Sequence, residues 1–157
     1  MVFKTHNRVS WGLTDRRAEG IADCEARAAT HGLGSIRWPD PWPTSDLRAA
    51  RGIVYAQTRG LLKEFALSAM RLAFLEGRDL EQRETVLEAG RRVGIEPGEL
   101  AAALEDQAIK DGLRALNDQA LALGVFGVPT VAIGTELFWG DDRLDSAAYA
   151  YSALRDG

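Results

Sequence analysis

The segment Gly124–Leu144, which reads GVFGVPTVAIGTELFWGDDRL, restricts the fold of this chain more than any other segment. Two runs rich in β-branched and aromatic residues, Thr130–Gly134 and Glu136–Trp139, predict two short strands. The Gly134–Thr135 step between them predicts a tight hairpin. Because an isolated hairpin is only marginally stable in water, these strands need helices, a further strand or another chain to pack against.

Most of the remaining chain predicts helix. One helix is expected over Arg16–His31, and a last one over Leu144–Leu154. Between them we expect a helix that ends near Arg59, one over Leu61–Phe74, one from Asp79 to Gly94, a short one that starts at Pro97 and a long one that ends at Gly124. The helix that finishes at Gly124 carries apolar residues at helical spacing, which predict one continuous buried stripe of Ile109, Leu113, Leu116, Ala120 and Leu123.

The segment SIRWPDPWPT, residues 35–44, interrupts the helices. Its three prolines exclude helix and predict a short strand or an extended crossing segment. Trp38 and Trp42 lie beside these prolines. Two interpretations stay open at this point: a rigid connector whose indoles cover the core, or an aromatic wall beside a ligand.

Charge and length exclude several classes of function. The 157 residues are enough for one domain with a core of its own. A net charge of −4 argues against a nucleic-acid surface, which would need a basic stripe. No apolar run approaches the ~20 residues that span a bilayer, and Met1–Ser10 lacks the apolar core of a signal peptide. We therefore expect neither a nucleic-acid nor a membrane partner, and a cytoplasmic location.

Cysteine and histidine are too few for most metal and redox chemistry. Cys24 is the single cysteine, which excludes an internal disulfide and a CxxC pair. It lies on the apolar side of its predicted helix and is expected to be a small buried hydrophobic residue. His6 and His31 have no partner at metal-binding spacing, so no metal site is expected.

The residue types near the hairpin suggest a ligand. The backbone N–H and C=O of Val128, just before Pro129, are candidates to pair with an extended, peptide-like ligand. The carboxylates of Asp141 and Asp142 could hold an ammonium group. A small peptide with a free amino end meets both demands. Asp142 is also expected to cap the last helix, with Asp145 completing a capping box.

The same segment closely resembles the C-terminal part of a DsbA-like branch of the thioredoxin superfamily. This branch contains 2-hydroxychromene-2-carboxylate isomerases and kappa-class glutathione transferases, and the resemblance extends back through RWPDPWP to about Trp11. It implies an α/β, thioredoxin-like fold that is mostly helical, with a short β-hairpin near the C-terminus. Residues 1–46 and 124–157 would form the thioredoxin-like part, and residues 47–123 an all-helical insertion.

The resemblance also implies glutathione as the cofactor. Pro129 would follow a cis peptide bond, and Val128 would pair its backbone with the cysteinyl part of glutathione. Asp142, together with Asp141, would hold the γ-glutamyl end, while Arg143 would anchor the loop. A small aromatic substrate would rest against Trp38, Trp42 or Trp139.

The catalytic residue of this branch is a serine or cysteine at the start of an N-terminal helix. No Ser-Pro or Cys-Pro helix start precedes Arg16, so the resemblance implies that this residue lies in a segment absent from the chain. The chain is thus expected to lack roughly the first quarter of such a protein, including strand, helix and strand. The exposed edge that remains on the sheet would invite association, a homodimer included.

Several functions follow from these expectations. The first is a glutathione-dependent isomerase of the 2-hydroxychromene-2-carboxylate isomerase type, acting on an aromatic metabolite. The second is a kappa-class-like glutathione transferase, or a glutathione-binding module that is inactive without the N-terminal residue. A thiol-disulfide oxidoreductase is disfavoured because the sequence has no CxxC, and a shortened product without enzymatic activity is the remaining alternative.

Overall fold

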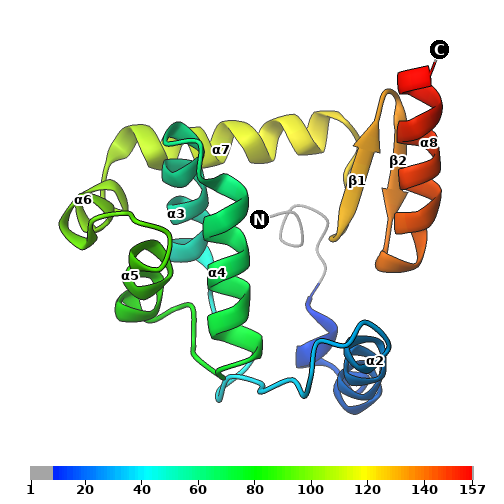
Figure 1. The fold of residues 1–157 in the computed structure, drawn as a ribbon, viewed down its shortest axis with the longest axis horizontal. Coiled ribbons are helices and arrows are strands. Elements are labelled where there is room, and N and C mark those ends of the chain that lie inside the picture. Colours follow the sequence, from blue (N-terminus) through cyan, green and yellow to red (C-terminus); the bar gives the residue numbers. More distant parts are fainter. Residues whose placement is uncertain (1–8, 157) are drawn as a thin grey trace. The chain divides into compact units, whose positions relative to one another are not determined.

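The computed structural model describes residues 9–156, which fall into two compact units (Figure 1). The helical unit is Ser10–Arg114. The C-terminal unit comprises, among the described residues, Val9 and residues 115–156. The predicted boundaries at residues 46 and 124 rest on the resemblance and stay a prediction.

The helical unit confirms the expected series of helices. It contains a short 3-10 turn η1 (Trp11–Leu13), then α2 (Arg17–Thr30), α3 (Leu47–Thr58), α4 (Leu62–Phe74), α5 (Arg83–Arg91), α6 (Pro97–Ala103) and the first half of α7 (Gln107–Ala122). Helix α3 packs against α4, α5 and α6, and α4 also packs against α5.

The core of the helical unit forms where these helices meet. Helix α4 contributes Phe65, Ala69 and Leu72, which lie on one face because their spacing matches the helical repeat. They pack with Val86 of α5 and Leu100 of α6, and all five side chains are buried. Burial of apolar area on this scale supplies the main stabilising free energy of the helices.

The continuous buried stripe expected along α7 is wrong. Ile109 is buried with Val54 and Ala103, but Leu116 is 41% exposed and Leu123 is 60% exposed. Helical spacing determines which side chains share a face. It does not determine how far other elements extend along that face, and Val54 and Ala103 cover only the first turns of α7.

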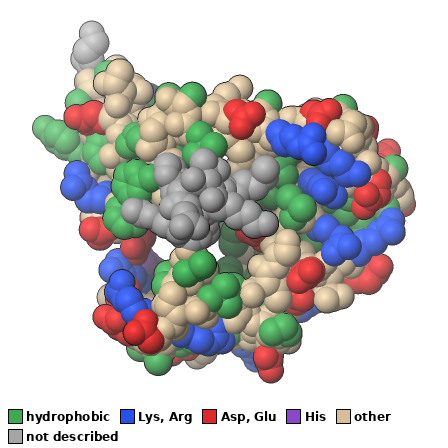
Figure 2. Space-filling view, turned by 180° about the vertical axis from the view of Figure 1, so that it is seen from behind, with side chains coloured by type: hydrophobic (Ala, Val, Ile, Leu, Met, Phe, Trp, Pro, Cys, Tyr) green, Lys and Arg blue, Asp and Glu red, His purple; other side chains and the backbone are tan. Residues whose placement is uncertain are grey.

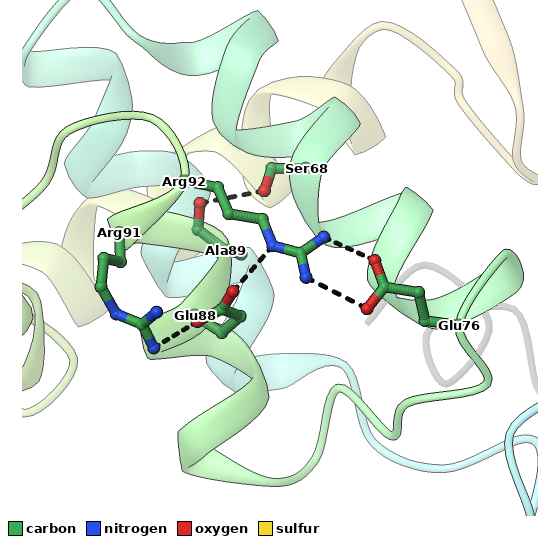
Figure 3. A network of polar contacts seen from close by, with 6 residues as sticks. All are labelled: Ser68, Glu76, Glu88, Ala89, Arg91 and Arg92. Atoms are coloured by element: carbon green, nitrogen blue, oxygen red, sulfur yellow. Dashed lines mark hydrogen bonds and ion pairs between the residues drawn. The ribbon is translucent and has the colours of Figure 1, made fainter.

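A guanidinium group ties the end of α4 to α5 (Figure 3). Arg92 donates to both carboxylate oxygens of Glu76, at 2.5 and 3.1 Å, and its Nε donates to Glu88 at 2.8 Å. The hydrogen bonds from Arg92 lower the pKa of both glutamates. In the same region, the buried hydroxyl of Ser68 donates to the carbonyl of Ala89 at 3.0 Å.

The proline-rich segment forms neither helix nor strand, and it bends at Asp40, Pro41 and Pro43. Trp38 and Trp42 pack on each other, with ring centroids 4.5 Å apart, and both contact Trp11. The Arg17 guanidinium lies over the Trp42 ring and donates to the Trp42 carbonyl at 2.6 Å. These contacts make the segment a fixed connector between α2 and α3.

The C-terminal unit confirms the predicted hairpin and last helix. Strands β1 (Thr130–Ile133) and β2 (Glu136–Trp139) are antiparallel, and they are followed by a 3-10 turn η2 (Asp141–Arg143) and helix α8 (Leu144–Asp156). Phe138 and Ala147 are its buried apolar residues within the described part.

Different segments cover the two faces of the hairpin. Phe138 lies on the face that meets α8, whose Ala147 is buried there. On the other face, Leu137 lies against Gly124, and Trp139 lies against Phe126 and Gly127. This division follows from the alternation of side chains along a strand. The contacts of Leu137 and Trp139 hold the loop that leads into β1.

The surface carries both signs of charge. On the face shown in Figure 2, acidic and basic side chains are interspersed. Within the described residues, no helix has the length and the apolar character that a membrane crossing needs.

Candidate functional site

The hairpin brings the two halves of the predicted glutathione site together. Thr130 pairs with Trp139 at the open end of the hairpin, so the residues before β1 meet the residues after β2. The Gly140 N–H then donates to the Pro129 carbonyl at 3.0 Å. Val128 and Pro129 therefore lie next to the loop that carries Asp141 and Asp142.

Val128 is an exposed residue. The residue is 58% exposed, and the Val128–Pro129 peptide bond is cis, as the resemblance implies. Among residues 9–156, neither the N–H nor the C=O of Val128 has a hydrogen-bond partner. The backbone thus offers one donor and one acceptor to an extended ligand.

The loop before Val128 is held by a hydroxyl group and an indole. Thr130 Oγ1 donates to the Gly127 carbonyl at 2.7 Å. Trp139 packs against Phe126, with ring centroids 5.0 Å apart, and its indole covers Gly127. A Cβ at position 127 would overlap the indole Nε1 and lie 3.1 Å from Cδ1, so only glycine fits there.

The acidic loop turns at Gly140, whose φ of 105° favours glycine. The carboxylate of Asp142 folds back over Gly140, where it would overlap a Cβ. Asp141 and Asp142 are both exposed. The Arg143 guanidinium lies 5.9 Å from the centre of the Phe138 ring, which fits the anchoring role that the resemblance implies.

The expected capping box is wrong. Asp142 lies inside η2, whose N-cap is Gly140, and α8 begins only at Leu144. The chain turns at Gly140 and passes through the 3-10 turn directly into α8. The Asp142 carboxylate is therefore near Gly140 instead of at the start of the last helix.

The three tryptophans predicted to line a substrate fall into different units. Trp38 and Trp42 belong to the helical unit and its aromatic cluster, and Trp139 belongs to the C-terminal unit. Trp139 is half exposed and packs against the loop before Val128. The role of all three toward a substrate stays a prediction.

A hollow of about 550 Å³ lies between β2 and α8. Its lining consists of Glu136, Phe138, Asp145, Ser146, Tyr149 and Ala150, and it includes none of the predicted glutathione residues. Val128 and the acidic loop thus form an exposed backbone site rather than part of this hollow.

Other candidate groups add little chemistry. Cys24 is half-buried on α2 rather than fully buried. His6 lies outside the described residues, and among residues 9–156 no group of three metal-ligating side chains could hold an ion. The catalytic serine or cysteine that the resemblance implies stays a prediction.

The chain matches a known protein family. The model of the DSBA-like thioredoxin domain matches residues 14–152, which is most of the chain. The chain belongs to this family.

Two relatives are similar to this chain over most of its length. The 2-hydroxychromene-2-carboxylate isomerase of Sphingobium xenophagum is 27% identical over 125 residues, which are 80% of this chain and 63% of that protein. A solved structure of selenomethionine 2-hydroxychromene-2-carboxylate isomerase matches with a TM-score of 0.81 and 20% identity, over 98% of this chain and 75% of that one. The chain thus spans less than two thirds of the curated relative, and it has the DsbA-like thioredoxin fold.

Two residues of the site escaped sequence reasoning. The sequence predicts Thr130 only as the first residue of a strand, and it shows Gly127 only as the start of a Gly-Val-Pro step. The signal available for Thr130 was a hydroxyl residue directly after Pro129, which can bond to a backbone carbonyl a few residues earlier. For Gly127 there was no local signal, because its partner Trp139 is distant in sequence.

Proposed function

We propose that this chain binds glutathione through Val128 and the acidic loop, and that it acts as a glutathione-dependent isomerase of the 2-hydroxychromene-2-carboxylate isomerase type. One observation carries the proposal: the exposed residue Val128, whose N–H and C=O have no partner among the described residues, lies next to the Asp141–Asp142 loop, and the Gly140–Pro129 hydrogen bond holds the two segments together. The relation to the Sphingobium xenophagum isomerase supports the class of reaction.

The chemistry of these groups fits a short peptide with a free amino end. The N–H and C=O of Val128 can bond to the cysteinyl residue as a neighbouring strand would. The carboxylates of Asp141 and Asp142 can accept hydrogen bonds from the γ-glutamyl ammonium, and such charge-assisted bonds are stronger than neutral ones. These residues bind and orient the tripeptide.

Glutathione, when bound, supplies a thiol whose reversible addition to a conjugated double bond allows rotation about that bond. The part of this chain is to hold the cysteinyl residue in place. An aromatic substrate would rest against Trp139, Trp38 or Trp42.

Titration calorimetry with reduced glutathione tests the binding step. Asp142→Asn should weaken binding about tenfold, because one charge-assisted contact is lost. Asp145→Asn, on α8, is the matched control and should bind like the unsubstituted protein. No binding by the unsubstituted protein at millimolar glutathione would overturn the proposal.

A kappa-class-like transferase or a binding module without isomerase activity is the second candidate, because it would use the same Val128 and Asp142 contacts. Turnover of 2-hydroxychromene-2-carboxylate in the presence of glutathione distinguishes them. Isomerisation supports the first function. Glutathione binding without isomerisation supports the second.

A further inference from the structure

The peptide unit that carries the Val128 N–H is held by a hydrogen bond to its carbonyl group, which belongs to Gly127. The C=O of Gly127 and the N–H of Val128 belong to one planar unit, which is trans in this structure, so the two groups point in opposite directions. Thr130 Oγ1 donates to the Gly127 carbonyl at 2.7 Å. The bond that holds this carbonyl therefore also sets the direction of the Val128 N–H.

We propose that Thr130 is a positioning residue for ligand binding, and that its hydroxyl orients the Val128 N–H. This role rests on the proposed function, in which Val128 is a backbone contact for glutathione. Thr130 itself contacts the loop and not the ligand.

The loop needs such a restraint because of Trp139. The indole lies so close to position 127 that only glycine fits. Glycine, however, allows its neighbouring peptide units to rotate more freely than any other residue. The indole requires glycine at position 127, and the hydrogen bond from the Thr130 hydroxyl restricts the peptide rotation that this glycine would allow.

The next fixed unit lies on the other side of Val128. The Pro129 carbonyl accepts the Gly140 N–H at 3.0 Å, which holds the Pro129–Thr130 peptide unit. The unsatisfied N–H and C=O of Val128 thus lie between two hydrogen-bonded carbonyls, those of Gly127 and Pro129. A donor and an acceptor that are held in place before binding lose less conformational entropy when a ligand arrives.

A purely structural role for Thr130 makes a different prediction, because valine has nearly the same shape and is as good a strand former. Thr130→Val keeps the shape and removes the hydroxyl, whereas Thr130→Ser keeps the hydroxyl. Thr58→Val is the matched control. Thr58 also donates to a backbone carbonyl three residues earlier, that of Tyr55 at 2.7 Å, but it ends helix α3 in the helical unit.

The experiment combines titration calorimetry with glutathione and the amide NMR signal of Val128 in the ligand-free protein. Thr130→Val should raise the dissociation constant for glutathione about fivefold, as loss of one hydrogen bond does, and should broaden or split the Val128 amide signal. Thr130→Ser and Thr58→Val should keep the dissociation constant and the signal of the unsubstituted protein.

Each result decides one of the two proposals. Equal binding by Thr130→Val, or weaker binding by Thr130→Ser as well, would overturn the positioning role and leave the proposed function intact. If the unsubstituted protein does not bind glutathione, the proposed function fails, and the role of Thr130 in ligand binding fails with it. An unchanged Val128 amide signal in Thr130→Val overturns the positioning role regardless of binding.

Discussion

In the helical unit, five large apolar side chains are completely buried: Phe65, Leu72, Val86, Leu100 and Leu104. In the described part of the C-terminal unit, the buried apolar residues are Phe138 and Ala147. The loop that carries Val128 has a different set of contacts. Thr130 and Gly140 bond to its carbonyls, and the Trp139 indole covers Gly127.

The two regions differ in what their contacts hold in place: whole helices in the first, and individual backbone groups in the second. Helices that pack against one another need apolar area removed from water, and many side chains can provide it. A backbone that binds a ligand needs particular N–H and C=O directions, which apolar burial does not set. In the loop that carries Val128, hydrogen bonds hold the neighbouring carbonyls of Gly127 and Pro129.

Loss of core volume should have the largest effect. Phe65→Ala, in the core of the helical unit, should lower the free energy of unfolding by about 4 kcal/mol, because it removes a buried ring and leaves a cavity. Leu67→Ala on the same helix is the control. Leu67 is 45% exposed and should cost far less. Urea unfolding followed by circular dichroism measures both, and equal losses would contradict the division into a buried and an exposed face.

A change at the loop should have an intermediate effect. Gly127→Ala places a methyl group against the Trp139 indole and should destabilise the C-terminal unit by about 2 kcal/mol. Hydrogen exchange of the amides in β1 and β2 measures this loss. The effect should shrink when the same substitution is made in a Trp139→Ala background. An equal loss in both backgrounds would show that the indole is not the cause.

The Arg92 contacts should have the smallest effect and should depend on pH. Because Arg92 lowers the pKa of Glu76 and Glu88 in the folded state, these ion pairs stabilise the fold above the ordinary glutamate pKa of 4.5. That stabilisation is lost as the pH falls through the lowered pKa values. Arg92→Gln should therefore be less stable than the unsubstituted protein at pH 7, and the difference should shrink below about pH 4.

Urea midpoints between pH 3 and 7 measure this pH dependence. Arg91→Gln is the control, because the more exposed Arg91 pairs with Glu88 and not with Glu76. Its effect should be smaller at every pH. A difference for Arg92→Gln that stays constant with pH would exclude the two carboxylates as its source.

Much of the local structure could be predicted from the sequence. The Gly134–Thr135 turn between two β-branched and aromatic runs gave the hairpin with its correct strands, because a two-residue connection fixes the register. The positions of glycine, proline and acidic residues gave helices whose observed ends differ by a few residues. The resemblance gave the family and the candidate residues of the site.

Other features could not be predicted because they depend on residues distant in sequence. The spacing of Ile109, Leu116 and Leu123 shows a shared face, but the cover over that face comes from Val54 and Ala103. Asp142 had the residue type of a helix cap, but the turn at Gly140 moved it into η2.

The sequence by itself determined which segments become helices and strands, because hydrophobic spacing, glycine and proline act within a few residues along the chain. The tertiary structure alone decided that Trp139 covers Gly127 and that Gly140 bonds to Pro129. Both contacts join the segment before β1 to the end of β2 at the open end of the hairpin, and their geometry arises only when the strands pair. The position of Val128 next to the acidic loop, on which the proposed binding depends, follows from that pairing.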